Sequence, residues 1–204
     1  MPRVVLLGDS IFDNGAYVPG GPDVARQLRT ELGGAWKVTL LAVDGAVMDD
    51  VSRQLGRLPA DATHLVLSVG GNDALYHVGL LEPGIGVDVL ARLADAAADF
   101  APRYDAVLEA VRRQGLPLLA CTIYEGNLGG SMQKRAIGGV AAFNDRIQRA
   151  ALRLGVPVLE LRDLTNEPAD YANPIEPSVQ GGEKIARAIA QWARQTETVS
   201  TVEA

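Results

Sequence analysis

Short apolar runs rich in β-branched residues alternate along the chain with segments whose apolar residues recur at helical spacing. In the first such segment, Val24, Leu28 and Leu32 fall on one helical face. Strands that are apolar throughout are buried on both faces, as in a parallel sheet. The alternation predicts an α/β fold with three layers, α/β/α, around a five-stranded, doubly wound parallel sheet. The apolar runs cover 3–7, 37–43, 64–69, 116–124 and 156–161, and the helical segments cover about 23–32, 48–58, 87–114, 132–154 and 178–194.

The 204 residues are expected to form one domain over 1–195, followed by a polar, flexible tail over 196–204. Two connections are longer than a compact fold requires, namely 76–86, which is rich in Gly and Pro, and 162–177. Long connections inside a domain usually carry function or move. We therefore expect both to line a ligand pocket.

The composition is ordinary for a globular protein, with 48% hydrophobic and 22% charged residues and a net charge of −6. An acidic balance argues against nucleic acid or an anionic membrane as the main partner. The apolar runs are shorter than the roughly 20 residues of a membrane span, and no basic-then-apolar leader opens the chain. We expect a cytoplasmic protein, although a secreted protein after removal of its leader would look the same. The pattern of apolar and polar residues does not indicate the oligomeric state.

Polar residues follow each of the first three predicted strands. Ser10 follows the first in Gly8-Asp9-Ser10, Gly45 follows the second after Asp44, and Asn72 follows the third in Gly71-Asn72-Asp73. Ligands of open α/β sheets bind outside the carboxyl ends of the strands. In a flavodoxin-like strand order the second, first and third strands are neighbours, so these residues converge. The set suggests acyl transfer, in which the Ser10 hydroxyl attacks a carbonyl carbon. The backbone N–H groups of Ser10 and Gly45 and the Asn72 amide would hold the oxyanion.

With these blocks in this order, the chain resembles the SGNH (GDSL) hydrolase family of esterases and lipases. The matching blocks are Gly8-Asp9-Ser10-Ile11, Gly45, Gly70-Gly71-Asn72-Asp73 and Pro177-Ser178-x-x-Gly181 at the start of the last helix. The resemblance covers nearly the whole chain. It implies the SGNH-hydrolase type of fold and a serine hydrolase that cleaves carboxylic esters of small or medium acyl groups. It implies no cofactor, and the sequence has neither metal-ligand spacing nor a phosphate loop.

One block departs from the family pattern. The family places an Asp and a His, three residues apart, just before Pro-Ser, whereas this chain has Asn173 and Glu176 at those positions. Glu176 has three open interpretations. It is the general base, it orients a polar substrate while another group takes the proton, or it marks a site that binds ligands without hydrolysis. The last would make the protein a binding module on the same fold.

A glutamate is a weaker base than imidazole, because free Glu has a pKa of about 4.3 against about 6.5 for His. Burial would raise the pKa of Glu176, while the N-terminus of the following helix would lower it. We expect slow catalysis from this conflict. Glu also serves as the base for Ser in serine–carboxyl peptidases, which have another fold and a second supporting acid. Asn173 could only orient Glu176 through a hydrogen bond.

The remaining candidates have ordinary structural interpretations beside functional ones. Asp9 and Asp73 flank the site, and their first interpretation is structural, as turn-forming and helix-capping residues. His77 follows Asn72 by five residues and could overhang the pocket, although a surface histidine is the commoner case. Asp9, Asn173 and His77 are the candidate substrate contacts. His64 opens a strand at the far end of the sheet and is expected to have no part in the chemistry.

Overall fold

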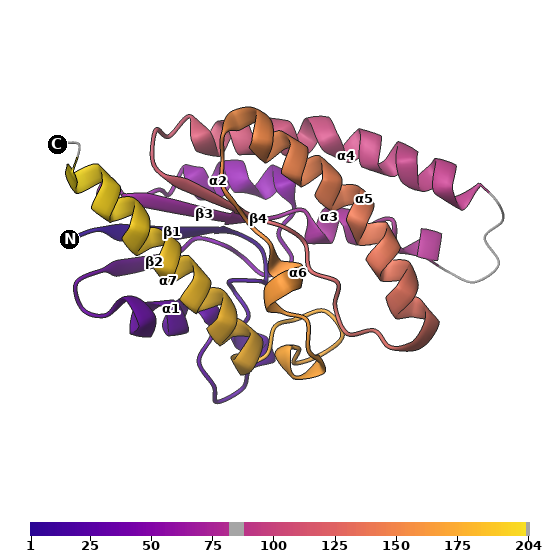
Figure 1. The fold of residues 1–204 in the computed structure, drawn as a ribbon, viewed down its shortest axis with the longest axis horizontal. Coiled ribbons are helices and arrows are strands. Elements are labelled where there is room, and N and C mark those ends of the chain that lie inside the picture. Colours follow the sequence, from indigo (N-terminus) through magenta and orange to yellow (C-terminus); the bar gives the residue numbers. More distant parts are fainter. Residues whose placement is uncertain (82–87, 203–204) are drawn as a thin grey trace.

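The computed structural model describes the backbone of residues 1–81 and 88–202 (Figure 1). One parallel sheet has the strand order β2-β1-β3-β4-β5. The second, first and third strands are therefore neighbours, and the predicted flavodoxin-like order is confirmed. The strands are β1 (Arg3–Gly8), β2 (Lys37–Leu40), β3 (His64–Ser68), β4 (Leu118–Cys121) and β5 (Val158–Leu159).

Helices cover both faces of the sheet (Figure 1). α1 (Val24–Leu32) and α7 (Val179–Val202) lie on one face, and α2 (Val51–Leu55), α4 (Val89–Arg112) and α5 (Gly130–Leu154) lie on the other. Alternate residues of β1 pack into the two cores, which explains why this strand is apolar throughout. The predicted three-layer α/β/α arrangement is confirmed. The shorter helical segments are η1 (Gly15–Tyr17), η2 (Met48–Asp50), α3 (Gly71–Leu75), η3 (Val78–Leu81), α6 (Leu161–Leu164) and η4 (Pro168–Asp170).

Three strands are shorter than the apolar runs that predicted them. β2 ends early, at Leu40, because the next two N–H groups, of Leu41 and Ala42, both donate to the carbonyl of Leu6. β4 and β5 keep only four and two residues of their predicted runs. The apolar character of these runs follows burial, which extends beyond the hydrogen-bonded part of each strand.

The last helix is longer than predicted. α7 continues past Arg194 to Val202, and the hydroxyls of Thr196 and Thr198 donate to carbonyls one turn earlier. The tail therefore begins as helix, and its flexibility stays a prediction. No helix in the described part of the chain is long and apolar enough to cross a membrane.

Both long connections contain regular structure. The first forms η3 and then reaches residues 82–87, which lie outside the described residues, as does the predicted helix start at position 87. The second contains most of α6, then η4, and closes with an antiparallel bridge between Tyr171 and Pro177. This connection therefore has a defined backbone conformation, and it leads directly into the block that contains Glu176.

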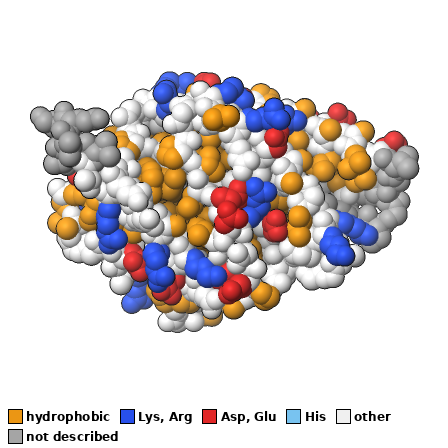
Figure 2. Space-filling model, viewed as in Figure 1, with side chains coloured by type: hydrophobic (Ala, Val, Ile, Leu, Met, Phe, Trp, Pro, Cys, Tyr) orange, Lys and Arg blue, Asp and Glu red, His pale blue; other side chains and the backbone are white. Residues whose placement is uncertain are grey.

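Acidic and basic side chains are interspersed on the face of the molecule in Figure 2. Exposed ion pairs include Arg187 with Glu183 and Arg149 with Asp145, each one helical turn apart. A mixture of both signs is typical of a water-exposed surface. It differs from the clustered basic stripe that marks a nucleic-acid interface.

Candidate active site

The turn after β1 requires a glycine and presents the serine. Gly8 has φ +124°, and a Cβ there would lie 1.7 Å from the carbonyl oxygen of Ser68 on β3. The amide of Gln54 holds the same residue from α2. Its Nε2 donates to the Gly8 carbonyl at 2.8 Å, and the Gly8 N–H donates to its Oε1 at 2.7 Å. Ser10 lies two residues further along the chain. The turn that carries it is held by the close approach of Gly8 to Ser68 on one side and by the Gln54 amide on the other.

Ser10 and Glu176 meet although 166 positions separate them. The Ser10 Oγ donates to Glu176 Oε1 at 3.1 Å, and both residues are buried, at 8% and 5% exposure. A hydroxyl within hydrogen-bond reach of an acceptor carboxylate is the arrangement of a nucleophile with its base. The structure thus brings together the two residues that the first and last sequence blocks singled out.

Hydrogen bonds from two segments hold the backbone around Glu176 in place. The Oδ1 of Asn173 accepts the N–H groups of Ile175 and Glu176, both at 2.9 Å. From the β1 side, the Asn14 amide donates to the carbonyl of Pro177 at 3.1 Å. Asn173 therefore orients Glu176 through the backbone and does not touch its carboxylate. Its prediction as a substrate contact is not supported, because it is not among the residues that line the cavity described below.

Burial dominates the electrostatics of Glu176. It raises the pKa of the carboxyl to about 7, with the charge of Asp44 adding to the shift and the hydrogen bond from Ser10 opposing it. The expected conflict between burial and the N-terminus of α7 is thus resolved in favour of burial. The second oxygen, Oε2, is buried and has no hydrogen-bond partner among the described residues. It remains as a free acceptor in the site.

Asp9 places a second carboxyl beside the first. Its Oδ1 accepts the N–H of Ile11 at 3.3 Å, which confirms the turn-forming interpretation, and its side chain also lines the cavity. Burial raises its pKa to about 8, and the charges of Glu176 and Asp73 add to the shift. Position 173 holds an amide and not a second acid. The structure instead places a buried carboxyl on the residue before Ser10.

The predicted oxyanion donors are only partly brought together. Asn72 lines the cavity, and its Nδ2 donates to the carbonyl of Ala46 at 2.9 Å, which leaves the second amide N–H for another acceptor. Gly45, with φ +76°, adjoins Ala46 but lines a separate hollow with Asp44. The backbone N–H groups of Ser10 and Gly45 have no partner within residues 1–81 and 88–202. The role of Gly45 stays a prediction.

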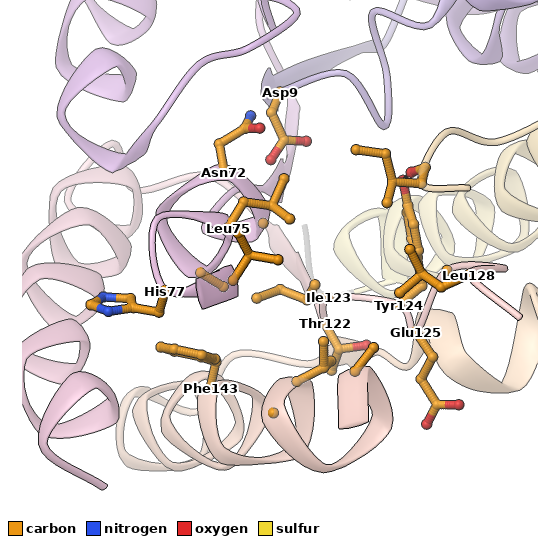
Figure 3. A pocket seen from close by; sticks show the side chains of 18 of the residues that line it. Asp9, Asn72, Leu75, His77, Thr122, Ile123, Tyr124, Glu125, Leu128 and Phe143 are labelled. Atoms are coloured by element: carbon orange, nitrogen blue, oxygen red, sulfur yellow. Dashed lines mark hydrogen bonds between the residues drawn. The ribbon is translucent and has the colours of Figure 1, made fainter. Parts of the chain in front are cut away.

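A cavity of about 230 Å³ opens beside these polar groups (Figure 3). Asp9, Ser10, Asn72 and Glu176 contribute to its lining, and most of the remaining wall is apolar. Pockets with apolar walls and a few converging polar groups are typical of sites for small organic ligands. The wall comes from α3, η3, α4, α5 and the segment after β4, and includes Leu75, Leu80, Leu93, Ile123, Val140 and Phe143.

The two histidines have different surroundings. His77 lines the cavity, and its ring stacks on Phe143 with centroids 5.9 Å apart, away from Asp9 in Figure 3. His77 is half-buried, and its role as a substrate contact stays a prediction. His64 is buried at the opposite end of β3 between the rings of Trp36 and Trp192. Its predicted separation from the site is confirmed.

Sequence reasoning missed three residues that support the site. Gln54 lies three positions after the buried Val51, and a polar residue on that apolar helical face was the signal that could have found it. Asn14 left no such signal. Arg103 forms an ion pair with Asp73 at 2.8 Å, while the other Asp73 oxygen accepts the N–H of Met48 at the start of η2 at 3.0 Å. Asp73 does not cap α3, on which it lies, because that helix has no side-chain cap. Within the described part of the chain, His, Cys, Asp and Glu side chains form no group able to hold a metal ion.

Comparisons with known proteins can now be set beside this geometry. Among solved structures, an extracellular lipase from Streptomyces rimosus has a TM-score of 0.72 at 17% identity, covering 95% of this chain and 100% of that one. A putative arylesterase from Agrobacterium tumefaciens has a TM-score of 0.64 at 17% identity, with coverages of 96% and 99%. The acetyl xylan esterase AlAXEase has a TM-score of 0.64 at 20% identity, with coverages of 94% and 98%.

These identities establish the shared fold. No curated protein sequence matches the chain. Residues 6–184 match the sequence profile of the GDSL-like lipase/acylhydrolase family, a span that contains all four blocks named above. The chain therefore belongs to the GDSL-like lipase/acylhydrolase family.

Proposed function

We propose that the protein is a serine esterase that cleaves carboxylic esters through an acyl-enzyme on Ser10, with Glu176 as the general base. The observation that carries the proposal is the 3.1 Å hydrogen bond from the Ser10 hydroxyl to the Glu176 carboxylate inside an apolar cavity. A lipase, an arylesterase and an acetyl xylan esterase share this fold, which supports a carboxylic ester as the substrate class.

In the first half of the reaction, Ser10 Oγ attacks the ester carbonyl carbon and its proton passes to Glu176. The carbonyl oxygen takes up the electron pair and is held by the Ser10 and Gly45 N–H groups and the free N–H of Asn72. Collapse of this intermediate expels the alcohol, which receives the proton from Glu176. In the second half, Glu176 takes a proton from water and the water oxygen attacks the acyl carbon. The bond between that carbon and Ser10 Oγ then breaks, Glu176 returns the proton to Ser10 Oγ, and the acid leaves.

The raised pKa of Glu176 suits this work. A base transfers protons most effectively when its pKa lies near the operating pH. A solvent-exposed glutamate would be ionised at neutral pH but too weakly basic to activate a hydroxyl well. Burial brings the pKa of Glu176 to about 7, close to that of an imidazole, and so offsets the absence of the family histidine.

The test compares hydrolysis of p-nitrophenyl acetate by the wild type, Ser10→Ala and Glu176→Gln. We expect Ser10→Ala to lose turnover and Glu176→Gln to lose about 10²–10⁴-fold in kcat, the usual contribution of a general base. Glu183→Gln is the matched control, because Glu183 is exposed on α7 and pairs only with Arg187 among the contacts described for it. A fluorophosphonate should label Ser10 in the wild type and in the control.

The outcomes separate the two parts of the proposal. Full activity in Ser10→Ala would exclude this site as the source of hydrolysis. Activity lost in Ser10→Ala but kept in Glu176→Gln would leave the nucleophile and remove the base. A wild type that neither turns over esters nor reacts with the fluorophosphonate would point to a ligand-binding protein on the same fold.

A further inference from the structure

We propose that the apolar part of the cavity binds a linear, medium-length acyl chain, so that the substrates are esters of medium-chain fatty acids with small or polar alcohols. This inference rests on the proposed serine esterase and adds the substrate class to it. It is carried by the position of the apolar wall relative to the base and by the size of the cavity.

The base defines the side from which the alcohol leaves. The group that takes the serine proton must later reach the leaving oxygen, so the alcohol lies on the Glu176 side. That side is bordered by the segment after β4. The Tyr124 hydroxyl donates to the Ile175 carbonyl, and Asn127 N donates to the Pro174 carbonyl at 2.7 Å.

The alcohol side is open and partly polar. Leu128, at 37% exposure, and the half-buried Glu125 line it, and in Figure 3 they lie together with Tyr124 across the cavity from His77 and Phe143. A carboxylate and an open rim favour an uncharged polar alcohol or a cationic one, and disfavour an anionic group such as a phosphate. The long apolar part of the substrate therefore belongs on the opposite side.

On the opposite side, the cavity wall begins at Asn72, the proposed oxyanion donor. Asn72 and Leu75 are three residues apart on α3 and so share a helical face, and the wall goes on to His77 stacked against Phe143. α5 completes it with small residues that leave room for a chain. The charged lining residues within the described part of the chain are Asp9, Glu125 and Glu176, which stand at the Ser10 end or on the alcohol side. The small residues of α5 are Ala136, Gly139 and Val140.

The volume indicates how long the chain can be. A water-sized group occupies roughly 30 Å³, so a cavity of about 230 Å³ holds about seven or eight groups of the size of a methylene. An acetyl group would leave most of this space unfilled. Because this volume covers the acyl and alcohol sides together, a hexanoyl or octanoyl group with a small alcohol fills it, and a hexadecanoyl chain exceeds it.

The first experiment measures kcat/KM for p-nitrophenyl esters from acetate to palmitate. Each buried methylene should raise kcat/KM by about fourfold until the cavity is full, at hexanoate or octanoate, with no further gain beyond. A flat series, or a maximum at acetate, would overturn the inference. The failure of the proposed function looks different, because then neither ester turnover nor fluorophosphonate labelling of Ser10 would be observed.

A pair of isomers tests which side of the ester enters the cavity. Ethyl octanoate and octyl acetate have the same atoms, but the long chain is acyl in the first and alcohol in the second. We expect kcat/KM to be at least tenfold higher for ethyl octanoate. A preference for octyl acetate would assign the cavity to the alcohol and overturn the inference.

Two adjacent glycines provide a matched pair of variants. Gly139 is buried and lines the cavity, while Gly138 is exposed and a Cβ there would meet nothing within 4 Å. Gly139→Leu should lower the octanoate-to-acetate ratio of kcat/KM by tenfold or more, and Gly138→Leu should leave it unchanged. If Gly139→Leu fails to fold, Val140→Phe narrows the same wall from a half-buried position. An unchanged ratio in the folded wall variant would overturn the inference.

Discussion

At the residue scale, the proposed site has a buried carboxylate where the family pattern has an imidazole. The hydroxyl of Ser10 needs a partner that is unprotonated but still basic near neutral pH. A glutamate meets that need only when water is kept from it, because water stabilises the ionised form and lowers the pKa. Glu176 is 5% exposed and burial raises its pKa to about 7, so in the proposed mechanism it has a basicity close to that of the imidazole in the family pattern.

The pH dependence of activity follows from this pKa. The kcat/KM for p-nitrophenyl esters should rise with pH through about 7, because Glu176 must lose its proton before it can act as a base. An imidazole would give a similar profile, so the profile is measured also in His77→Ala. That variant should keep the rising limb, while the residual activity of Glu176→Gln should lack it. A limb that disappears with His77 would contradict the assignment of Glu176.

Stability should respond to pH in the opposite sense from activity. A carboxyl whose pKa is higher in the folded protein than in the unfolded chain holds its proton more tightly when folded. The stability that it contributes is present below its unfolded pKa of about 4 and is lost as pH rises to its folded pKa. This contribution is lost as the pH rises to about 8 for Asp9 and to about 7 for Glu176, which are the pKa values of the two carboxyls in the folded protein.

The free energy of unfolding, measured with urea, should therefore fall between pH 5 and pH 8. Each group contributes a slope of up to about 1.4 kcal/mol per pH unit within its window. Asp9→Asn and Glu176→Gln should each flatten the dependence, since the other titrating groups are common to wild type and variants. Equal slopes in all three proteins would show that these carboxyls are not held protonated.

At the scale of elements, the nucleophile depends on a contact between a turn and a helix. Gly8 passes close to Ser68, and the side chain of Gln54 on α2 satisfies both backbone groups of Gly8. At the other end of the chain, Gly181 brings α7 so close to the second long connection that a Cβ would lie 2.2 Å from the Asp170 carbonyl oxygen. Both catalytic candidates thus stand next to a point where only glycine allows two backbones to meet.

Removing Gln54 should weaken the turn that carries Ser10. Gln54→Ala leaves the buried N–H of Gly8 unpaired, at a cost of about 1–3 kcal/mol in the free energy of unfolding, while the Gly8 carbonyl keeps the hydrogen bond from the Val43 N–H at 3.1 Å. Arg53→Ala is the control, because Arg53 is the neighbouring residue and its side chain is 80% exposed. Chemical denaturation of both variants measures the difference. A loss no larger than that of the control would mean that water replaces the Gln54 amide.

At the scale of the whole molecule, the fold is shared with lipases and esterases at 17–20% identity. What these proteins have in common is the edge of a parallel sheet where strand ends meet, and loops of different shape can be placed around it. The predicted absence of nucleic acid from the partners stays a prediction. The cytoplasmic location predicted from the start of the chain stays a prediction.

The sequence by itself determined the alternation of strands and helices and the blocks at the strand ends, because both depend on residues close together in the chain. The strand order pairs segments far apart in the chain, and it was expected from the type of fold. A strand buried on both faces needs a continuous apolar run, and a turn such as that at Gly8 needs its glycine within the motif. The same locality explains why the Ser10, Asn72 and Glu176 positions were found before their contacts were known. The boundaries at Leu40 and past Arg194 were missed, because pairing and helix length depend on neighbours elsewhere.

Only the tertiary structure decided how the site works. The pKa of Glu176, the second carboxyl of Asp9, the supporting amides of Asn14 and Gln54 and the size of the cavity all arise where distant segments pack together. Burial and hydrogen bonding at such points depend on which segments pack together, so they cannot be predicted from the residue type alone. The residue type alone leaves the role of a glutamate in the histidine position open, whereas its surroundings in three dimensions raise its pKa to about 7, which supports the proposed role as a base.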